Sequence, residues 1–403
     1  MRGLKYLGLW LIFMAHPLLA INDGCVTNCL TWTTQIVTVC ASGCSATSAN
    51  NALTQTSSTG CICLQGDITQ STQMNLSRSV GVITSDGSFA AGTMRNWYMN
   101  AVGAVIFVGA PQSLSSVINI SNIHMENNAS SAGVGRVLQG QTFGSSGAWP
   151  TGSGLHVYDC DLISSQPGGT AANLDFNSNS FTAGATLLIE RCRVGKTSAA
   201  IGSTPKLFDF NATLPNVANT IVLRNILSDS GSLTTTTATS ALGIKSGPQV
   251  PAPYEFDNIL FTGLSSSAKA IQGTDNFLIN NCVFYTPNAG AYEFDTSTAG
   301  NIVVPARVTA QNNAFQNLTA FAGAGNIFSS SWASSFYDPA NGNFKLSGRN
   351  SALFNAGIDL TGSGVIVDIL GVARPQAISF DIGPYEQPDF FRTVPAANVR
   401  MVP

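Results

Sequence analysis

The middle of the chain repeats one short hydrophobic pattern seven times, and the pattern changes phase at its centre. Each copy has a polar residue at the centre, with mostly apolar side chains two and four residues before it and one and three residues after it. Alternation with a period of two predicts a strand with one buried face. A shift of one residue between two such strands predicts that the chain turns a corner at the centre. The seven centres are Asn122, Asp159, Arg191, Asn225, Asn258, Asn281 and Asn312.

The spacing of these centres indicates stacked repeat units. Asparagine suits a corner because it tolerates the left-handed backbone region and hydrogen-bonds to nearby backbone groups. The centres recur at intervals of 23 to 37 residues, a length typical of repeat architectures. One such unit is too thin to bury its own apolar face, so neighbouring units must stack. Strands that recur once per unit in the same direction predict parallel sheets, and therefore a parallel β-helix.

Two other repeat architectures fit the pattern less well. Helical repeats need apolar residues three and four positions apart, whereas these segments are rich in Val, Ile, Thr, Asn, Ser and Gly. A propeller needs several antiparallel strands per period, and the pattern contains one bent pair of strands per period. The Gly- and Ser-rich run 129–154 is expected to be a long protruding loop.

The first residues read as a secretory signal. Arg2 and Lys5 precede the apolar stretch 7–15, and the small residue Ala20 follows it. A membrane anchor would need about 20 consecutive apolar residues, and this stretch is shorter. The expected organisation is a signal peptide at 1–20, a Cys-rich N-terminal cap at 21–65, β-helix coils at 66–330, C-terminal closing coils at 331–386 and a tail at 387–403.

The nine cysteines fall into two groups. Six lie in the predicted cap, and an exported chain without a nearby His favours three disulfides there over a zinc site. Their connectivity is left open. The other three occupy one inward column of the repeat and are expected to be buried free thiols, although Cys160 and Cys192 lie on adjacent coils, where a bridge is geometrically allowed. The cap cysteines are Cys25, Cys29, Cys40, Cys44, Cys61 and Cys63, and the third core cysteine is Cys282.

The outward columns beside the corners contain the candidate binding residues. Stacking predicts that Glu190, Arg224 and Asp257 form one line, at about 4.8 Å per coil. One interpretation is an acidic, aromatic-edged groove for a glycan, with acid and base residues in it. The other is a ladder of surface ion pairs between neighbouring strands. The residues assigned to this face are His156, Tyr158, Glu190, Arg224, Glu255 and Asp257.

No established catalytic motif is present, and no catalytic residue, metal ligand or cofactor is assigned. His124 and His156 are isolated in the sequence, which argues against a metal site at either of them. Charged residues make up only 10% of the chain and the net charge is −3. Such a balance argues against a nucleic-acid partner or an anionic membrane surface.

The end of the chain resembles the closing block of bacterial secreted right-handed β-helix proteins of the choice-of-anchor Q type. The resemblance rests on the run NSALFNAG at 350–357, on Arg374-Pro375 and on the run DIGPYE at 381–386, where Pro384 stands in place of an Ala. It implies the pectate-lyase-like superfamily fold, and an ionic network that ties down the last coil. Four charged residues would form that network, namely Asp368, Arg374, Asp381 and Glu386.

Taken with the repeat, this resemblance leads to an all-β fold, a right-handed parallel β-helix (solenoid) with a disulfide-rich N-terminal cap. The expected function is a structural or adhesive role in a secreted or surface-exposed protein that binds a polysaccharide or a cell-surface glycan. The alternative is a polysaccharide lyase or glycoside hydrolase acting on an extracellular polysaccharide. The fold does not decide between them, because the related proteins include both enzymes and adhesins. The oligomeric state stays open.

Overall fold

The computed structural model describes most of the chain between residues 23 and 387. The described ranges are 23–29, 35–109, 113–129, 135–140, 148–165, 172–176, 180–196, 206–210, 220–229, 242–243, 254–262, 269–271, 276–285, 292–294, 307–316, 318, 320–376 and 378–387. The predicted signal peptide at 1–20, and the predicted tail except Gln387, lie outside these ranges. No helix in the described part is long and apolar enough to cross a membrane.

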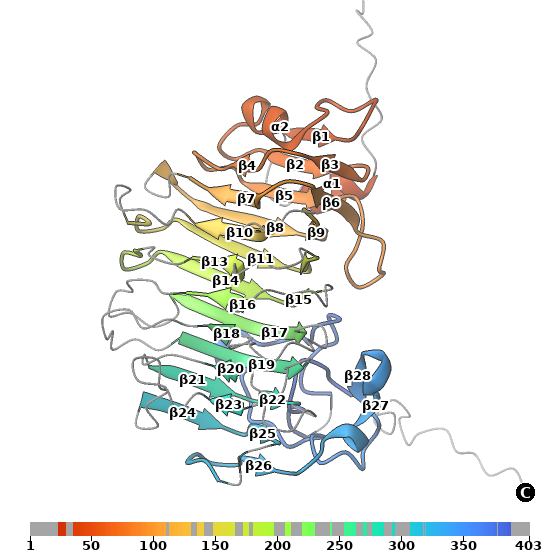
Figure 1. Ribbon diagram of the computed structural model, residues 1–403, viewed down its shortest axis with the longest axis vertical. Coiled ribbons are helices and arrows are strands. Elements are labelled where there is room, and N and C mark those ends of the chain that lie inside the picture. Colours follow the sequence, from red (N-terminus) through yellow and green to blue (C-terminus); the bar gives the residue numbers. More distant parts are fainter. Residues whose placement is uncertain are drawn as a thin grey trace, which may run out of the picture.

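Parallel strands stack from coil to coil along the whole molecule, as the sequence predicts (Figure 1). The larger sheet has 18 strands in the described residues, all joined by parallel pairings. Its strands are β1 (Ile36–Val39), β2 (Cys61–Leu64), β3 (Ile68–Gln70), β5 (Val82–Ser85), β6 (Arg95–Met99), β8 (Val117–Ser121), β9 (Ile123–Asn127), β11 (Gly154–Tyr158), β12 (Asp161–Ser164), β14 (Thr186–Glu190), β15 (Arg193–Lys196), β17 (Ile221–Asp229), β19 (Tyr254–Thr262), β21 (Phe277–Asn280), β22 (Val283–Phe284), β24 (Val308–Gln311), β25 (Ala314–Phe315) and β26 (Ile327–Phe328).

A second parallel sheet supplies a third side for the coils from β4 to β18. It has six strands in the described residues, and a two-stranded parallel sheet and an antiparallel hairpin lie further along the chain. The six strands are β4 (Met74–Asn75), β7 (Gly103–Val108), β10 (Gly135–Gly140), β13 (Ala172–Asp175), β16 (Lys206–Asp209) and β18 (Leu242–Gly243). The smaller sheets are β20 (Lys269–Ile271) with β23 (Tyr292–Phe294) and β27 (Phe336–Asp338) with β28 (Asn343–Leu346).

The second sheet corrects one prediction from the sequence. The run 129–154 was expected to be a protruding loop, but it contains β10, which pairs with β7 on one side and β13 on the other. The strand reads GRVLQG and is bounded by glycines, so its composition resembles a turn. Trp149 from the same run is fully buried and stacks on Phe181 with ring centroids 5.2 Å apart. The run therefore contributes to the core.

The seven predicted corners are confirmed. Each centre has a left-handed backbone, with φ between 51° and 56°, and they are the residues Asn122, Asp159, Arg191, Asn225, Asn258, Asn281 and Asn312. L-residues adopt this conformation with difficulty, and Asn and Asp are the side chains that tolerate it best. The change of hydrophobic phase thus marks the point where the backbone turns between the two strands of a coil.

The inward columns form the core. Almost all of their side chains are buried, and Phe261, Phe284 and Phe315 stack on successive coils with centroids 4.9 and 5.0 Å apart. Cys160, Cys192 and Cys282 are buried free thiols, as predicted.

The N-terminal cap has the three predicted disulfides. They join Cys25 to Cys63, Cys29 to Cys61 and Cys40 to Cys44. Two short helices, α1 (Asp23–Cys29) and α2 (Ala49–Gln55), accompany β1 and β2, which already pair with the first coils. Ala49, Ala52 and Leu53 of α2 are buried in the main core, so this helix covers the apolar residues that the first coil would otherwise expose.

Residues 351–387 form a strap that folds back along the coils. The side-chain amides of three corner asparagines donate to its backbone, and these are Asn225 to Val367 O (2.9 Å), Asn281 to Ile358 O (2.9 Å) and Asn312 to Ala356 O (2.7 Å). Figure 1 shows the strap beside β17 to β25. The strap therefore binds the sides of several coils, whereas the sequence predicted that it would tie down the last coil.

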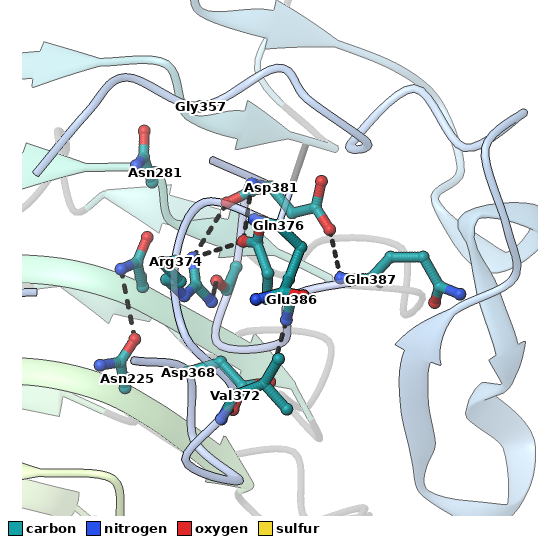
Figure 2. A network of polar contacts seen from close by, with 12 residues as sticks. Asn225, Asn281, Gly357, Asp368, Val372, Arg374, Gln376, Asp381, Glu386 and Gln387 are labelled. Carbon is teal, nitrogen blue, oxygen red and sulfur yellow. Dashed lines mark hydrogen bonds and ion pairs between the residues drawn. The ribbon is translucent and has the colours of Figure 1, made fainter. Parts of the chain in front are cut away.

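The four predicted charged residues do form a network, and it lies inside the strap (Figure 2). Arg374 and Glu386 are 3.6 Å apart with both side chains almost fully buried. Asp368 Oδ1 accepts hydrogen bonds from the backbone N–H groups of Leu370 and Val372, and Asp381 Oδ1 accepts one from Asn355 N–H. Buried charges need such partners, so the network fixes the strap's shape.

Candidate functional site

The strand register brings four of the six predicted binding residues into one row. Tyr158 pairs with Glu190, Glu190 with Arg224, and Arg224 with Asp257 on successive coils. His156 and Glu255 lie in a neighbouring row, separated by two coils. The two rows lie on the same strands, as the sequence predicts.

The predicted binding residues differ strongly in burial. Asp257 is fully buried and Glu255 is 4% exposed. Arg224 Nη2 lies 3.5 Å from Glu255 Oε1 and its Nε lies 3.7 Å from Asp257 Oδ2. Burial, reinforced by the charge of Glu255, raises the pKa of Asp257 well above its ordinary value. Asp257 and Glu255 thus form a buried acidic pair with Arg224, inaccessible to a surface ligand.

The other two predicted residues are half-buried. His156 Nε2 lies 2.9 Å from Thr186 Oγ1, and burial lowers the pKa of His156. The ring of Tyr158 lies beneath the guanidinium of Arg191, 5.8 Å from Cζ to the ring centroid. Of the six residues, Glu190 lines a cavity formed by the described part of the chain.

That cavity has a volume of about 560 Å³ and lies between the strap and the loop that precedes β6. We call it the corner cavity, because three consecutive corners form its floor. Polar and charged side chains come from the coils, and small or apolar residues come from the two covering segments. The lining residues are Asn122, Asp159, Glu190 and Arg191 from the coils, Ser88 and Ala90 from the loop, and Gly364, Ile366, Val367, Leu370 and Gly371 from the strap.

The strap explains why the cavity lies where it does. Three corner side chains, those of Asn225, Asn281 and Asn312, bond directly to the strap, whereas at Asn122, Asp159 and Arg191 the cavity separates the strap from the coils. Gly364 lies at the boundary, since a Cβ at this position would be 2.9 Å from Arg224 Nη1. The glycine has φ of 86°, a conformation that other residues adopt at a cost. The strap loop can therefore lie directly on Arg224.

An ion pair between two corners organises the floor. Arg191 Nε and Nη2 donate to the two carboxylate oxygens of Asp159, at 2.8 and 2.9 Å, and Nη1 donates to Glu190 Oε1 at 2.8 Å. Such a bidentate pair fixes both side chains. Burial opposes the charge on Arg191, but the hydrogen bonds and charges of Asp159 and Glu190 outweigh it and raise its pKa.

Glu190 lies in a different environment. Burial raises its pKa, although the charges of Arg191 and Arg224 oppose the shift. Asn122 completes the floor, where its Oδ1 accepts a hydrogen bond from Phe89 N–H at 3.2 Å. The floor thus contains one amide and one guanidinium that pairs with two carboxyl groups, of which Glu190 has a raised pKa.

Sequence reasoning missed Asp159, Arg191 and Asn122 as site residues because it treated the centres as turns only. A signal was present, however. Two of the seven centres are charged, and they are neighbouring centres of opposite charge, Asp159 and Arg191. Charged residues in the left-handed position on adjacent coils indicate a purpose beyond turning the chain.

A second polar cluster surrounds His124, which the sequence presents as isolated. The Nδ1 of His124 lies 3.3 Å from Asp161 Oδ2, and its Nε2 lies 3.2 Å from Glu126 Oε2. Burial opposes its charge, but hydrogen bonds to both carboxylates raise the pKa of His124 to about 9. Each ring nitrogen of His124 already has a carboxylate partner, so the cluster resembles a row of structural ion pairs.

No group of three or more His, Cys, Asp or Glu side chains in the described ranges could hold a metal ion. No family model matches the chain, and a search of curated proteins finds no significant relative. The candidate site is therefore interpreted from its geometry alone.

Proposed function

We propose that this protein is a secreted or surface-exposed β-helix with a structural or adhesive role, and that it binds a glycan in the corner cavity. The observation that carries the proposal is the two-sided lining of that cavity. Its floor offers the hydrogen-bonding groups of Asn122, Asp159 and Glu190, and its opposite wall offers Ile366 and Leu370. Sugars have hydroxyl groups around the ring and apolar C–H faces, so they match such a lining.

The size and rigidity of the cavity support the same function. A volume of about 560 Å³ is within the range of small-molecule sites, which combine apolar walls with a few fixed polar groups. The Arg191–Asp159 pair holds the floor, and the buried network holds the strap. A pre-formed site of this kind loses little entropy on binding.

Secretion is part of the proposal, supported by three disulfides, which persist in oxidising compartments. Membership among the choice-of-anchor Q proteins is also proposed. Its support is the resemblance of the closing block and the network of Asp368, Arg374, Asp381 and Glu386 within it.

Glycoside hydrolysis is a second candidate function, favoured by one observation. A carboxyl group with a raised pKa can donate a proton to a leaving oxygen, and Glu190 is such a group in the cavity. Release of reducing ends from a polysaccharide panel would support it, provided that Glu190→Gln abolishes the release. Absence of turnover in a protein that binds glycans would leave the adhesive role.

A glycan array with the full secreted chain tests the binding proposal, followed by calorimetry on the best hits. Ile366 is 60% exposed at the cavity, and Ile378 is 86% exposed on the same strap outside the lining. Ile366→Trp should fill the cavity and weaken binding at least tenfold, while the matched control Ile378→Trp should bind as the wild type does. Absence of any glycan binding, or equal effects of the two variants, would refute the proposal.

A further inference from the structure

We propose that the corner cavity selects the uncharged end of a glycan and discriminates against chains that end in a carboxylated or sulfated sugar. This inference rests on the proposed function and deepens it, because it names the ligand class of the same cavity. Three features of the lining lead to it: the pairing of its one cation, the balance of its charges and the two segments that bound it.

Arg191 is the only cation among the described residues of the lining, and carboxylates already neutralise it. Arg191 uses Nε, Nη1 and Nη2 to bind three carboxylate oxygens, two on Asp159 and one on Glu190. Sites that recognise carboxylates or sulfates present an unpaired Arg or a set of unshared N–H donors to the anion. An anionic sugar in the corner cavity would have to displace Asp159 or Glu190 from Arg191. The cost of that exchange favours a neutral ligand.

The remaining charge in the lining is also unfavourable to an anion. With both acids ionised, two carboxylates face one guanidinium, so the lining is net negative. Protonation of Glu190, which its burial promotes, would bring the lining to neutrality but would not make it positive. Beyond the boundary at Gly364, Arg224 is held by Glu255 and Asp257, and on the side of the loop Arg193, which lies over the ring of Phe89, is held by Asp161 at 2.9 Å. No state of these groups supplies a cation for an acidic ligand.

The covering segments favour a chain end over the middle of a polymer. Ser88 and Ala90 bound the cavity on one side, and the strap from Gly364 to Gly371 bounds it on the other. The floor between them spans three coils, from Asn122 to Arg191, or about 10 Å at the spacing of parallel strands. A polysaccharide that ran along the coils would meet both segments. A short terminal unit fits between them.

Matched sugars provide the test. Oligosaccharides that end in glucose or galactose are compared by calorimetry with those that end in glucuronic or galacturonic acid, which differ only at the sixth carbon. We expect at least tenfold tighter binding of the neutral member. Affinity per chain should also stay constant as a neutral oligosaccharide is lengthened, since only its end is bound.

Charge variants then locate the selectivity. Asp159→Asn frees Arg191 from its bidentate partner and should bring the preference for neutral sugars down at least fivefold. Glu190→Gln makes the same change of charge but affects only one hydrogen bond from Arg191. It replaces Asp159→Asn in the test if that variant unfolds more easily. Asp359→Asn is the matched control, because Asp359 is an exposed strap residue outside the lining.

The outcomes separate this inference from the function on which it rests. Glycan binding without a preference for neutral ends, or with an affinity that rises steadily with chain length, would overturn the inference and leave the binding function intact. An unchanged preference in both Asp159→Asn and Glu190→Gln would overturn it as well. Failure of every neutral and acidic probe to bind would refute the binding function itself.

Discussion

Asp159 and Arg191 occupy the same corner position on adjacent coils, and Arg191 binds both carboxylate oxygens of Asp159. Most corners of this chain are Asn residues, whose side chains serve the backbone or the strap. At these two corners the left-handed conformation instead points an acid and a base toward each other along the helix axis. A position that exists to turn the chain has thus become the floor of a cavity.

The pair should show strong energetic coupling. Arg191→Asn places the usual corner residue there but leaves Asp159 and Glu190 without their cation, and we expect it to lower the free energy of unfolding by about 1–3 kcal/mol. The double variant Asp159→Asn with Arg191→Asn should recover most of that loss. Urea denaturation of both single variants and the double variant measures the coupling. Additive losses would show that the two side chains act independently.

Asn281 should contribute to stability in two separable ways. Its φ is 52°, and its side chain both donates to Ile358 O and accepts from Ile358 N–H, at 2.9 and 3.0 Å. Asn281→Gly keeps the conformation accessible but loses both bonds, at a cost of about 1–3 kcal/mol. Asn281→Ala should cost about 1 kcal/mol more because of the left-handed backbone. Thermal unfolding of the two variants gives the comparison, and equal losses would argue against backbone strain at this corner.

His124 should make the protein less stable at alkaline pH. Its pKa is raised from 6.5 to about 9 in the folded state by Asp161 and Glu126, against the effect of burial. The folded state therefore binds the proton more tightly, so the stabilisation is fully present below pH 6.5 and is lost as the pH rises through 9. We expect a loss of up to about 3 kcal/mol over this range. His124→Gln should flatten the profile measured by urea denaturation, and a parallel profile would exclude His124 as the source.

Replacing Asp257 by a neutral residue should make the protein more stable, relative to the wild type, as the pH rises. Burial raises its pKa, and the acid shares a hydrogen bond with Glu255 and accepts one from Asn280 at 2.9 Å. Its protonated form fits the site, so the stability that it provides is present at acidic pH and is lost as the pH rises through its folded pKa. Asp257→Asn mimics the protonated form, and its stability relative to the wild type should rise with pH. A constant difference between them across the acidic to neutral range would contradict this assignment.

Much of the fold could be predicted because the repeat is local. The phase shift at Asn225 depends on side chains within four residues, and it correctly located a left-handed corner. Strand β10 of the second sheet escaped detection because it lies between glycines and carries a short apolar run. In a parallel β-helix the third side of a coil can be short and irregular in sequence, since its neighbours above and below set its conformation.

The site was harder to predict because the strap forms part of it. Residues Asn225 and Val367 are bonded across a separation of 142 residues, and no pattern along the chain reports that contact. The register of Glu190, Arg224 and Asp257 followed from the repeat alone, and it was correct. The repeat did not tell which of them would be accessible: Glu190 lines a cavity whose other wall is the strap, whereas Asp257 is fully buried.

The strap also has a consequence for how the protein matures. It follows the coils in the sequence, so it is synthesised after them, and it contributes Gly364, Ile366 and Leu370 to the cavity wall. Solenoid coils can form one after another as the chain emerges, so most of the stack can exist before any ligand has a place to bind. A chain truncated before the strap would keep the cavity floor without its wall. Ligand binding would therefore distinguish finished molecules from partly made ones.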